Sequence, residues 1–136
     1  KFGINRCIID AGGDLRLGHK PRGKSGWTIK IGGQNHPDLP TLSLEQCSVA
    51  TSGDYSQFVE INGIRYSHIL NPHTGYGLQN LSQITVICES GMKADSLATA
   101  CSVLGLNRIK KLSKSENFKA FVISQISDEQ VFEVVD

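Results

Sequence analysis

The sequence predicts an α+β fold, with a mainly antiparallel sheet, one principal helix and a short second helix. Three observations support this class. Strand-like runs come before and after a single helical stretch instead of alternating with helices, an Asn-Gly pair joins two β-rich runs, and helical periodicity is confined to residues 92–114. At 136 residues with 39% apolar side chains, the chain has the size and composition of a single domain over residues 1–136.

The strands expected in the first part of the chain are separated by glycine-containing turns. "RCIIDAGG" is typical of a short strand that runs into a turn, and "WTIKIGG" alternates apolar and polar residues as a strand does. A longer strand is expected from about Leu42 to Ala50, and we expect it to break at Ser52-Gly53.

The clearest local signal is a β-hairpin. Asn62-Gly63 lies between Phe58–Ile61 and Ile64–Ile69, and this dipeptide favours a two-residue turn with positive φ at both positions. The two runs should therefore pair antiparallel. His68 is then expected at the end of the second strand, where the pleat sets the direction of its side chain.

The remaining elements follow in order. "QITVICE" predicts a strand, "MKADSLATACSVLG" a helix closed by Gly105, and "LNRIKKLSK" a short second helix. "FKAFVIS" and "EQVFEVV" predict two final strands joined by a turn at Asp128-Glu129.

Composition excludes several classes of function. The net charge of +1 and the dispersed Lys and Arg residues give no basis for binding nucleic acid. The longest apolar runs, such as "ITVIC", are too short to cross a bilayer. The cysteines are isolated, which favours small buried apolar residues in a reduced protein over a disulfide framework or a zinc site. They are Cys7, Cys47, Cys88 and Cys101.

The principal helix carries a candidate metal site. At 100° per residue its apolar side chains share one face, and Asp95 and Thr99 lie together at the edge of that face. A carboxylate and a hydroxyl one turn apart are oxygen ligands that Mg²⁺ accepts when phosphates and waters complete its shell. The alternative is that Asp95 complements the helix dipole and Thr99 is a half-exposed helix residue. Spacing alone favours this alternative.

Three turns offer further candidates. "VATSGDY" would expose backbone N–H groups and the Ser52 hydroxyl to a phosphate or a flavin, or it is a plain turn. "DAGGD" lets a backbone approach a ligand, or it is a glycine turn between two strands. "SHILNPHTG" places His68 and His73 at a strand end, where they do chemistry, bind an anion or face solvent.

The motifs "DAGGDL", "VATSGDY", "SHILNPHTG" and "KADSLATACSVLG" occur in this order. Together they resemble the FAD:protein FMN transferase family, also called ApbE, and specifically its C-terminal portion. The resemblance covers roughly residues 6–125. It implies an α+β fold that binds FAD with Mg²⁺ on the pyrophosphate and transfers FMN to a Ser or Thr hydroxyl of an acceptor protein. AMP would be released.

The same resemblance assigns roles to single residues. Asp95 and Thr99 match the metal-binding helix residues, and His68 matches a histidine implicated in catalysis. The expected cofactor-binding residues lie in the three turns. They are Gly12, Gly13, Asp14, Ser52, Gly53, Thr74 and Gly75.

Two positions depart from the family pattern. Asn71 stands where the family usually has Asp, and His73 stands where a Lys or Arg is common, so a charge is lost at each. Asn71 can accept a hydrogen bond but would stabilise an imidazolium at His68 less well than a carboxylate.

Family members are about twice this length, which implies an upstream half in the same protein or on another chain. Three interpretations stay open: a flavin transferase, a module that binds FAD without transferring it, or a structural domain with degenerate motifs. Many members are exported lipoproteins, which would place the protein in a bacterial cell envelope or periplasm. The isolated cysteines are also compatible with the cytoplasm.

Overall fold

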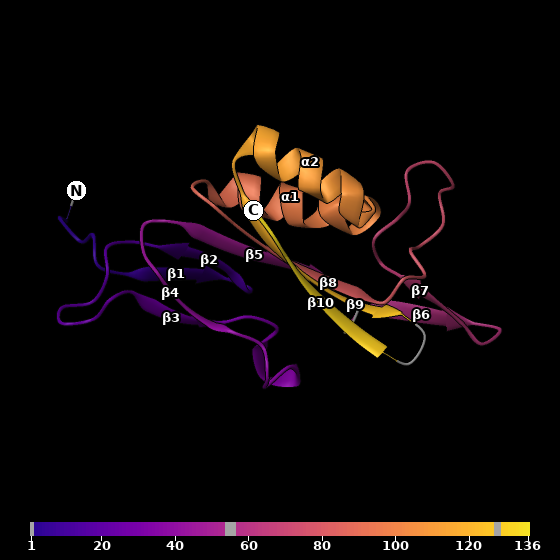
Figure 1. Ribbon diagram of the computed structural model, residues 1–136, viewed down its shortest axis with the longest axis horizontal. Helices are drawn as coiled ribbons and strands as arrows, with labels where there is room; N and C mark the ends of the chain where they lie inside the picture. Colours follow the sequence, from indigo (N-terminus) through magenta and orange to yellow (C-terminus); the bar gives the residue numbers. More distant parts are fainter. Residues whose placement is uncertain (1, 54–56, 127–128) are drawn as a thin grey trace.

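The computed structural model describes residues 2–53, 57–126 and 129–136. It confirms the α+β class, because two helices lie on one face of a six-stranded, fully antiparallel sheet (Figure 1). The sheet has the strand order β1-β2-β5-β8-β9-β10. Its strands are β1 (Ile8–Ala11), β2 (Asp14–Leu17), β5 (Ser48–Gly53), β8 (Ser82–Cys88), β9 (Lys119–Ile126) and β10 (Glu129–Val135).

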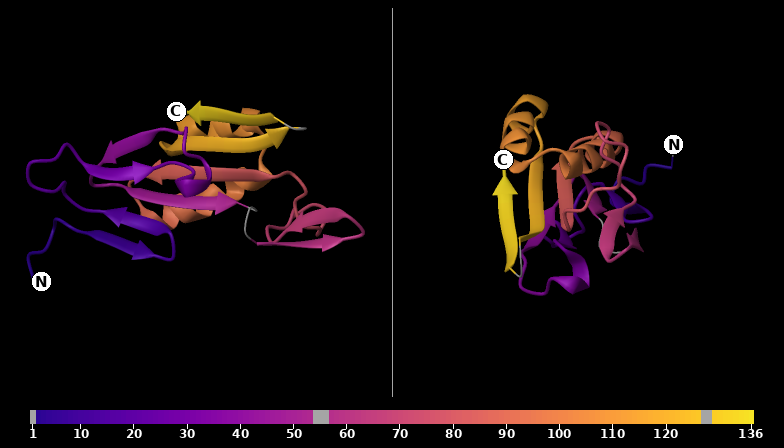
Figure 2. Two further views of the ribbon diagram at one scale, coloured as in Figure 1. Left: turned by 90° about the horizontal axis from the view of Figure 1, so that it is seen from below. Right: turned by 90° about the vertical axis from the view of Figure 1, so that its right-hand side faces the viewer.

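The other strands form two smaller, two-stranded sheets. In one, β3 (Trp27–Lys30) pairs with β4 (Thr41–Leu44), and in the other, β6 (Phe58–Ile61) pairs with β7 (Ile64–Ser67). The β3–β4 pair lies on the opposite side of the molecule from the helices, whereas the β6–β7 hairpin projects from one end (Figure 2). These positions put the hairpin beside the end of β5.

The helices α1 (Gly91–Val103) and α2 (Leu106–Glu116) cover the central strands. Side chains of α1 pack against β5 and β8, and those of α2 and β10 extend the same core. As the helical periodicity predicted, Ala94, Ala98 and Cys101 form the buried stripe of α1. The apolar sheet residues that face the helices are Ala50, Ile84, Val86, Cys88, Ala120, Val122 and Val135.

The opposite face of the sheet is partly covered by β3–β4 and the short 3₁₀ helix η1 (Gly33–Asn35). Ile31 is buried there, and the ring nitrogen Nδ1 of His36 lies 2.9 Å from the side-chain nitrogen of Gln130 in β10. On the same strand, the ring of Phe132 stacks on that of Phe121 with their centroids 6.2 Å apart. The segment before β5 is therefore attached to the last strand of the chain.

The prediction of one strand from Leu42 to Ala50 is wrong. This stretch belongs to two sheets, with β4 paired to β3 and β5 paired to both β2 and β8. The chain turns at Gln46, whose φ of 53° is left-handed and whose N–H donates to the Gly18 carbonyl. Ser52-Gly53 does not break the strand either, because both residues pair with β8 as the last two residues of β5.

Gly105 has a different role from the one predicted. Helix α1 ends at Val103 with Leu104 as its C-cap, and Gly105 is the N-cap of α2 with a φ of −68°. The left-handed conformation that glycine favours after a helix is therefore absent at this position. The second helix was expected from its sequence, and the structure confirms it.

The Asn62-Gly63 hairpin is confirmed. Both residues have positive φ, 52° and 75°, and β6 pairs antiparallel with β7. However, β7 ends at Ser67, so the prediction that His68 lies within a strand is wrong by one residue. The expected turn after β9 falls partly on Asp128, which lies outside the described residues, and Glu129 is the first residue of β10. Strand β2 was expected only in the alternative that made "DAGGD" a glycine turn between two strands.

Candidate functional site

The outer edge of α1 lies over the end of β5. Asp95 and Thr99 are both exposed on the same side of this helix, as the spacing predicted. The Thr99 hydroxyl donates to the Ser52 hydroxyl at an Oγ1–Oγ distance of 3.5 Å. Because Ser52 follows Ala50 by two residues in β5, its side chain shares the sheet face that α1 covers. The structure therefore brings the motifs "VATSGDY" and "KADSLATACSVLG" into contact.

Asp14 enters the same region from the neighbouring strand. It is the first residue of β2 and, together with Asp95, lines a cavity of about 270 Å³ between the first strands and the start of α1. Burial raises the pKa of the Asp14 carboxyl, and the carboxylates of Asp95 and Asp10 raise it further. Asp14 and Asp95 thus interact electrostatically, although they lie 81 positions apart in the chain.

The Gly12-Gly13 pair forms the turn of the β1–β2 hairpin, which agrees with the simpler interpretation of "DAGGD". The Gly13 N–H donates to the Asp10 carboxylate at 2.8 Å. No atom lies within 4 Å of a Cβ built on either glycine, so one side of the turn is open. A turn between two strands and an approach route for a ligand are therefore compatible here.

The oxygen atoms around Asp95 fit the chemistry of Mg²⁺. One or two carboxylates and the hydroxyls of Thr99 and Ser52 are hard ligands, and Mg²⁺ commonly takes few protein ligands and completes its shell with phosphate and water. Among residues 2–53, 57–126 and 129–136 no cluster of three or more His, Cys, Asp or Glu side chains is suited to a metal.

His68 is exposed just beyond β7 and is attached to the residue before β6. Its backbone N–H donates to the Gln57 carbonyl at 3.2 Å, and its ring nitrogen Nδ1 lies 3.1 Å from the same oxygen. The register that pairs Phe58 with Ser67 places Gln57 directly opposite His68. The ring is consequently oriented by the hairpin, although the residue itself lies outside the strand.

The loop that follows His68 is organised by Asn71. The Asn71 side-chain oxygen accepts the His73 N–H at 2.9 Å, and its backbone carbonyl accepts the N–H groups of Thr74 and Gly75. Its own N–H donates to the Tyr76 carbonyl at 2.8 Å. Asn71 thus builds the turn. The bonds described for it do not reach the His68 ring.

This loop, β7 and residues 77–80 line a second, surface-open cavity of about 460 Å³. Thr74 lines it, as a predicted cofactor-binding residue, whereas its two tyrosines and its three carboxamides were not predicted as lining residues. The lining residues missed by the sequence analysis include Tyr66, Tyr76, Gln79 and Asn80. Tyr66 and Tyr76 flank the histidine segment in the sequence, and this aromatic spacing was the available signal.

The two groups of candidate residues stay separate. In the described part of the chain, no hydrogen bond joins His68 to Ser52, Asp95 or Thr99. The connection between β5 and β6 runs through residues 54–56, so Asp54 and Tyr55 of the predicted "VATSGDY" turn lie outside the described residues. Gly53, the last described residue before them, sits against β8, because its Cβ would lie 3.0 Å from the Ser82 carbonyl oxygen.

Comparison with known proteins decides the family. The sequence model of the ApbE family matches residues 1–122. The chain belongs to the ApbE family. A FAD:protein FMN transferase of Vibrio cholerae is 32% identical over 133 residues, which cover 93% of this chain and 39% of that ApbE relative. An FAD:protein FMN transferase of Escherichia coli is 29% identical, with 93% of this chain and 37% of the relative covered.

Solved ApbE structures share the fold. A mutant of the flavin transferase ApbE from Vibrio cholerae superposes with a TM-score of 0.82 at 30% identity, over 98% of this chain and 43% of that chain. The ApbE protein of Thermotoga maritima gives a TM-score of 0.80 at 28% identity, over 96% and 42%. The chain thus spans about two fifths of the length of its ApbE relatives. No helix in the described residues has the length and apolar character needed to span a membrane.

Proposed function

We propose that this chain carries out part of the transfer of FMN from FAD to a Ser or Thr hydroxyl of an acceptor protein, with release of AMP. The observation that carries this proposal is the grouping of Asp14, Ser52, Asp95 and Thr99 at one edge of α1. Four oxygen-bearing side chains from three elements suit a pyrophosphate and its counterion. The names of the ApbE relatives support transfer of FMN from FAD to a protein.

FAD would lie along the turns at this end of the sheet. Gly12, Gly13 and Asp14 would contact it from β1–β2, and Ser52 and Gly53 from the end of β5. Thr74 and Gly75 would contact it from the loop after His68, where the larger cavity lies. The open side of the Gly12-Gly13 turn supports close approach of a ligand to the backbone.

Asp95 and Thr99 would hold Mg²⁺, with Asp14 close enough to interact with the same charge. When bound there, Mg²⁺ neutralises negative charge on the pyrophosphate. The protein side chains orient the nucleotide and hold the phosphates in place. Their own contribution is mainly one of positioning.

His68 would act as the general base. It takes the proton of the acceptor hydroxyl, and the hydroxyl oxygen forms a bond to the phosphorus of the FMN moiety. The bond between that phosphorus and the bridging oxygen breaks, and AMP leaves with the oxygen and its electron pair. The exposed position of His68 supports access by a protein substrate.

About 61% of the length of the Vibrio cholerae relative lies outside the matched region. We propose that corresponding polypeptide, upstream in the same protein or on another chain, supplies the remaining contacts to the nucleotide. The experiments below therefore use the native protein that contains residues 1–136.

Transfer is tested by incubating the native protein with FAD, Mg²⁺ and a protein extract of its source, followed by denaturing gel electrophoresis. We expect fluorescent flavin attached to an acceptor band and an equivalent amount of AMP by chromatography. His68→Ala should lower this transfer by about 10²- to 10⁴-fold with FAD binding retained. His73→Ala, the matched control in the same loop, should change little. Magnesium-dependent FAD binding with no flavin on any protein would instead establish a binding module.

A further inference from the structure

The ring of His68 is held by a group that no motif includes. The Gln57 carbonyl oxygen accepts the His68 backbone N–H at 3.2 Å and lies 3.1 Å from Nδ1 of the ring. Both contacts come from one oxygen atom across the open end of the β6–β7 hairpin. The distance to Nδ1 is in the normal range for a hydrogen bond.

The identity of the partner determines which ring nitrogen carries hydrogen. A backbone carbonyl has no hydrogen to donate, so Nδ1 must be the donor in this contact. A neutral imidazole carries a single N–H, and the Nδ1–H form therefore leaves a lone pair on Nε2. We infer that the Gln57 carbonyl is a positioning group that selects the Nδ1–H tautomer of His68 and makes Nε2 the proton acceptor. Its catalytic consequence rests on the proposed function.

The same contact supports the charged form of the ring. When Nε2 takes the proton of the acceptor hydroxyl, the imidazole becomes an imidazolium and the Nδ1–H stays bonded to the carbonyl oxygen. Hydrogen bonds from a charged donor are stronger than neutral ones, so the contact strengthens as the proton arrives. The carbonyl itself gains and loses no proton. It fills the place that a carboxylate takes in other histidine-based sites.

This arrangement accounts for the departure at Asn71. The Asn71 side chain accepts the His73 N–H and shapes the loop, a role that asparagine and aspartate fill equally well. The group at Nδ1 of His68 is the Gln57 carbonyl. Loss of the usual carboxylate at position 71 therefore leaves the orientation of His68 intact, and Asn71→Asp should not alter its tautomer.

The tautomer can be measured directly by NMR on the native protein. Ring-¹⁵N histidine and carbonyl-¹³C glutamine are incorporated together, and the His68→Gln variant identifies the His68 signals among those of the other histidines. We expect the Nδ1–H form at a pH where the ring is neutral, with a scalar coupling across the hydrogen bond between Nδ1 and the Gln57 carbonyl carbon. A His68 ring in the Nε2–H form would overturn the inference.

Two variants distinguish the role of the Gln57 backbone carbonyl from that of the Gln57 side chain. Gly63→Val places a β-branched residue at a φ of 75°, which should open the hairpin turn, abolish the coupling and lower kcat for FMN transfer by about 10- to 100-fold with KM for FAD unchanged. Gln57→Ala keeps the backbone carbonyl and, with carbonyl-¹³C alanine in place of glutamine as the label, should change none of these readouts. If Gly63→Val is unstable, Asn62→Ala perturbs the same turn more mildly.

The remaining outcomes distinguish the two proposals. Loss of the coupling in a folded turn variant that transfers FMN at the normal rate would overturn the positioning role. A clear Nδ1–H tautomer in a native protein that transfers no FMN would refute the proposed function and leave the structural assignment of the tautomer in place.

Discussion

At the scale of single residues, Asp95 shows how a helix spacing becomes a candidate site. The sequence placed it one turn from Thr99, and many helices contain such pairs without binding anything. The structure adds the Ser52 hydroxyl at 3.5 Å from Thr99 and the nearby carboxyl of Asp14. Side-chain oxygen atoms from β2, β5 and α1 therefore lie in one region. A purely structural role for Asp95 and Thr99 in the helix would not require this grouping.

Asp95→Ala should abolish the magnesium dependence of FAD binding in the native protein, because we propose this carboxylate as the charged Mg²⁺ ligand on α1. The Tm should change little, since the side chain is exposed. Calorimetric titration of FAD with and without Mg²⁺ measures this. Ser96→Ala, the adjacent exposed residue of α1, is the control, and unchanged magnesium dependence in Asp95→Ala would remove the metal assignment.

Asp14→Asn should raise the Tm at pH 7. Burial and the nearby carboxylates of Asp95 and Asp10 raise the folded-state pKa of Asp14, so its ionisation opposes folding as the pH rises above its ordinary value of 3.8. At pH 3 the carboxyl is largely protonated in both states, and the two proteins should unfold at similar temperatures. Thermal melts across this range test the sign, and a lower Tm for the variant at pH 7 would contradict it.

Cys101 should resist alkylation in the folded protein. Its thiol is buried under α1, and burial raises its pKa to about 11, which leaves little thiolate at pH 8. Mass spectrometry after iodoacetamide treatment should show Cys101 unmodified, with modification appearing in denaturant. The half-buried Cys7 is the internal comparison and should react first. Equal rates for the two thiols would indicate that the α1 core opens readily.

At the scale of elements, the β6–β7 hairpin and the loop after it form one unit. The Ser67 N–H donates to the Leu78 carbonyl, and the Leu78 N–H donates to the Ile69 carbonyl, so the returning chain runs beside the end of β7. A bridge between Leu70 and Gly77 closes the loop. His68 is therefore held from both sides, by Gln57 and by the return of its own loop.

Gly77→Ala should destabilise this loop. A Cβ at Gly77 would lie 2.4 Å from the Ser67 carbonyl oxygen, a backbone atom held in the hairpin, so the two segments would have to separate. We expect a loss of about 1–3 kcal/mol and weaker FAD binding. Gly105→Ser is the matched control, because that position is open and serves as a helix N-cap, where serine is favoured. Chemical denaturation of both variants measures the difference.

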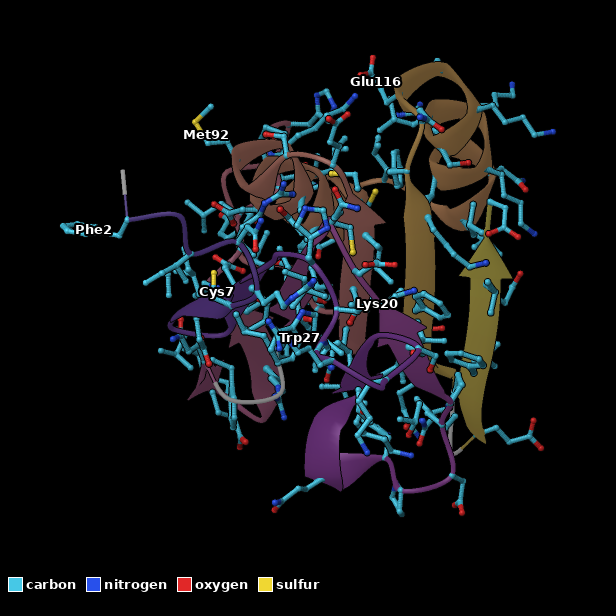
Figure 3. The ribbon with its side chains drawn as sticks, turned by 90° about the vertical axis from the view of Figure 1, so that its left-hand side faces the viewer. Phe2, Cys7, Lys20, Trp27, Met92 and Glu116 are labelled. Atoms are coloured by element: carbon cyan, nitrogen blue, oxygen red, sulfur yellow. The ribbon has the colours of Figure 1, made fainter. Side chains whose placement is uncertain are left out.

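At the scale of the whole molecule, the strand order explains how distant motifs meet. The sheet joins β1 at one edge to β10 at the other, and β5 and β8 lie at its centre under α1. Apolar side chains stay exposed near β1, where Phe2 and Met92 project from the same side of the molecule (Figure 3). Met92 also lines the smaller cavity, together with Ile9 of β1.

We propose that residues 1–136 form one cooperative domain, because strands from both ends of the chain share the large sheet and His36 attaches the η1 segment to β10. Trp27, the single tryptophan, lies in β3 and reports on the smaller sheet. Its fluorescence and the far-ultraviolet circular dichroism should therefore change at the same Tm. Two separate transitions would divide the chain into independent units.

Local patterns in the sequence were enough to predict the elements that depend on residues close together in the chain. The Asn62-Gly63 turn follows from two residues that tolerate positive φ, and the buried stripe of α1 follows from its periodicity. The Asp95 and Thr99 pair follows from the same periodicity. Each of these depends on neighbours within a few residues, so the pattern in the chain contains the necessary information.

The pairing of segments that are far apart in the chain became apparent only in the folded structure. The turn at Gln46 depends on the Gly18 carbonyl and on the fact that β4 and β5 enter different sheets, and no local pattern encodes either. The same holds for the approach of Asp14 to Asp95 and for the bond between His68 and the Gln57 carbonyl. Every residue has a backbone carbonyl, so residue type does not show which carbonyl binds a given side chain. The role of the Gln57 carbonyl becomes apparent only when the hairpin register places it opposite His68.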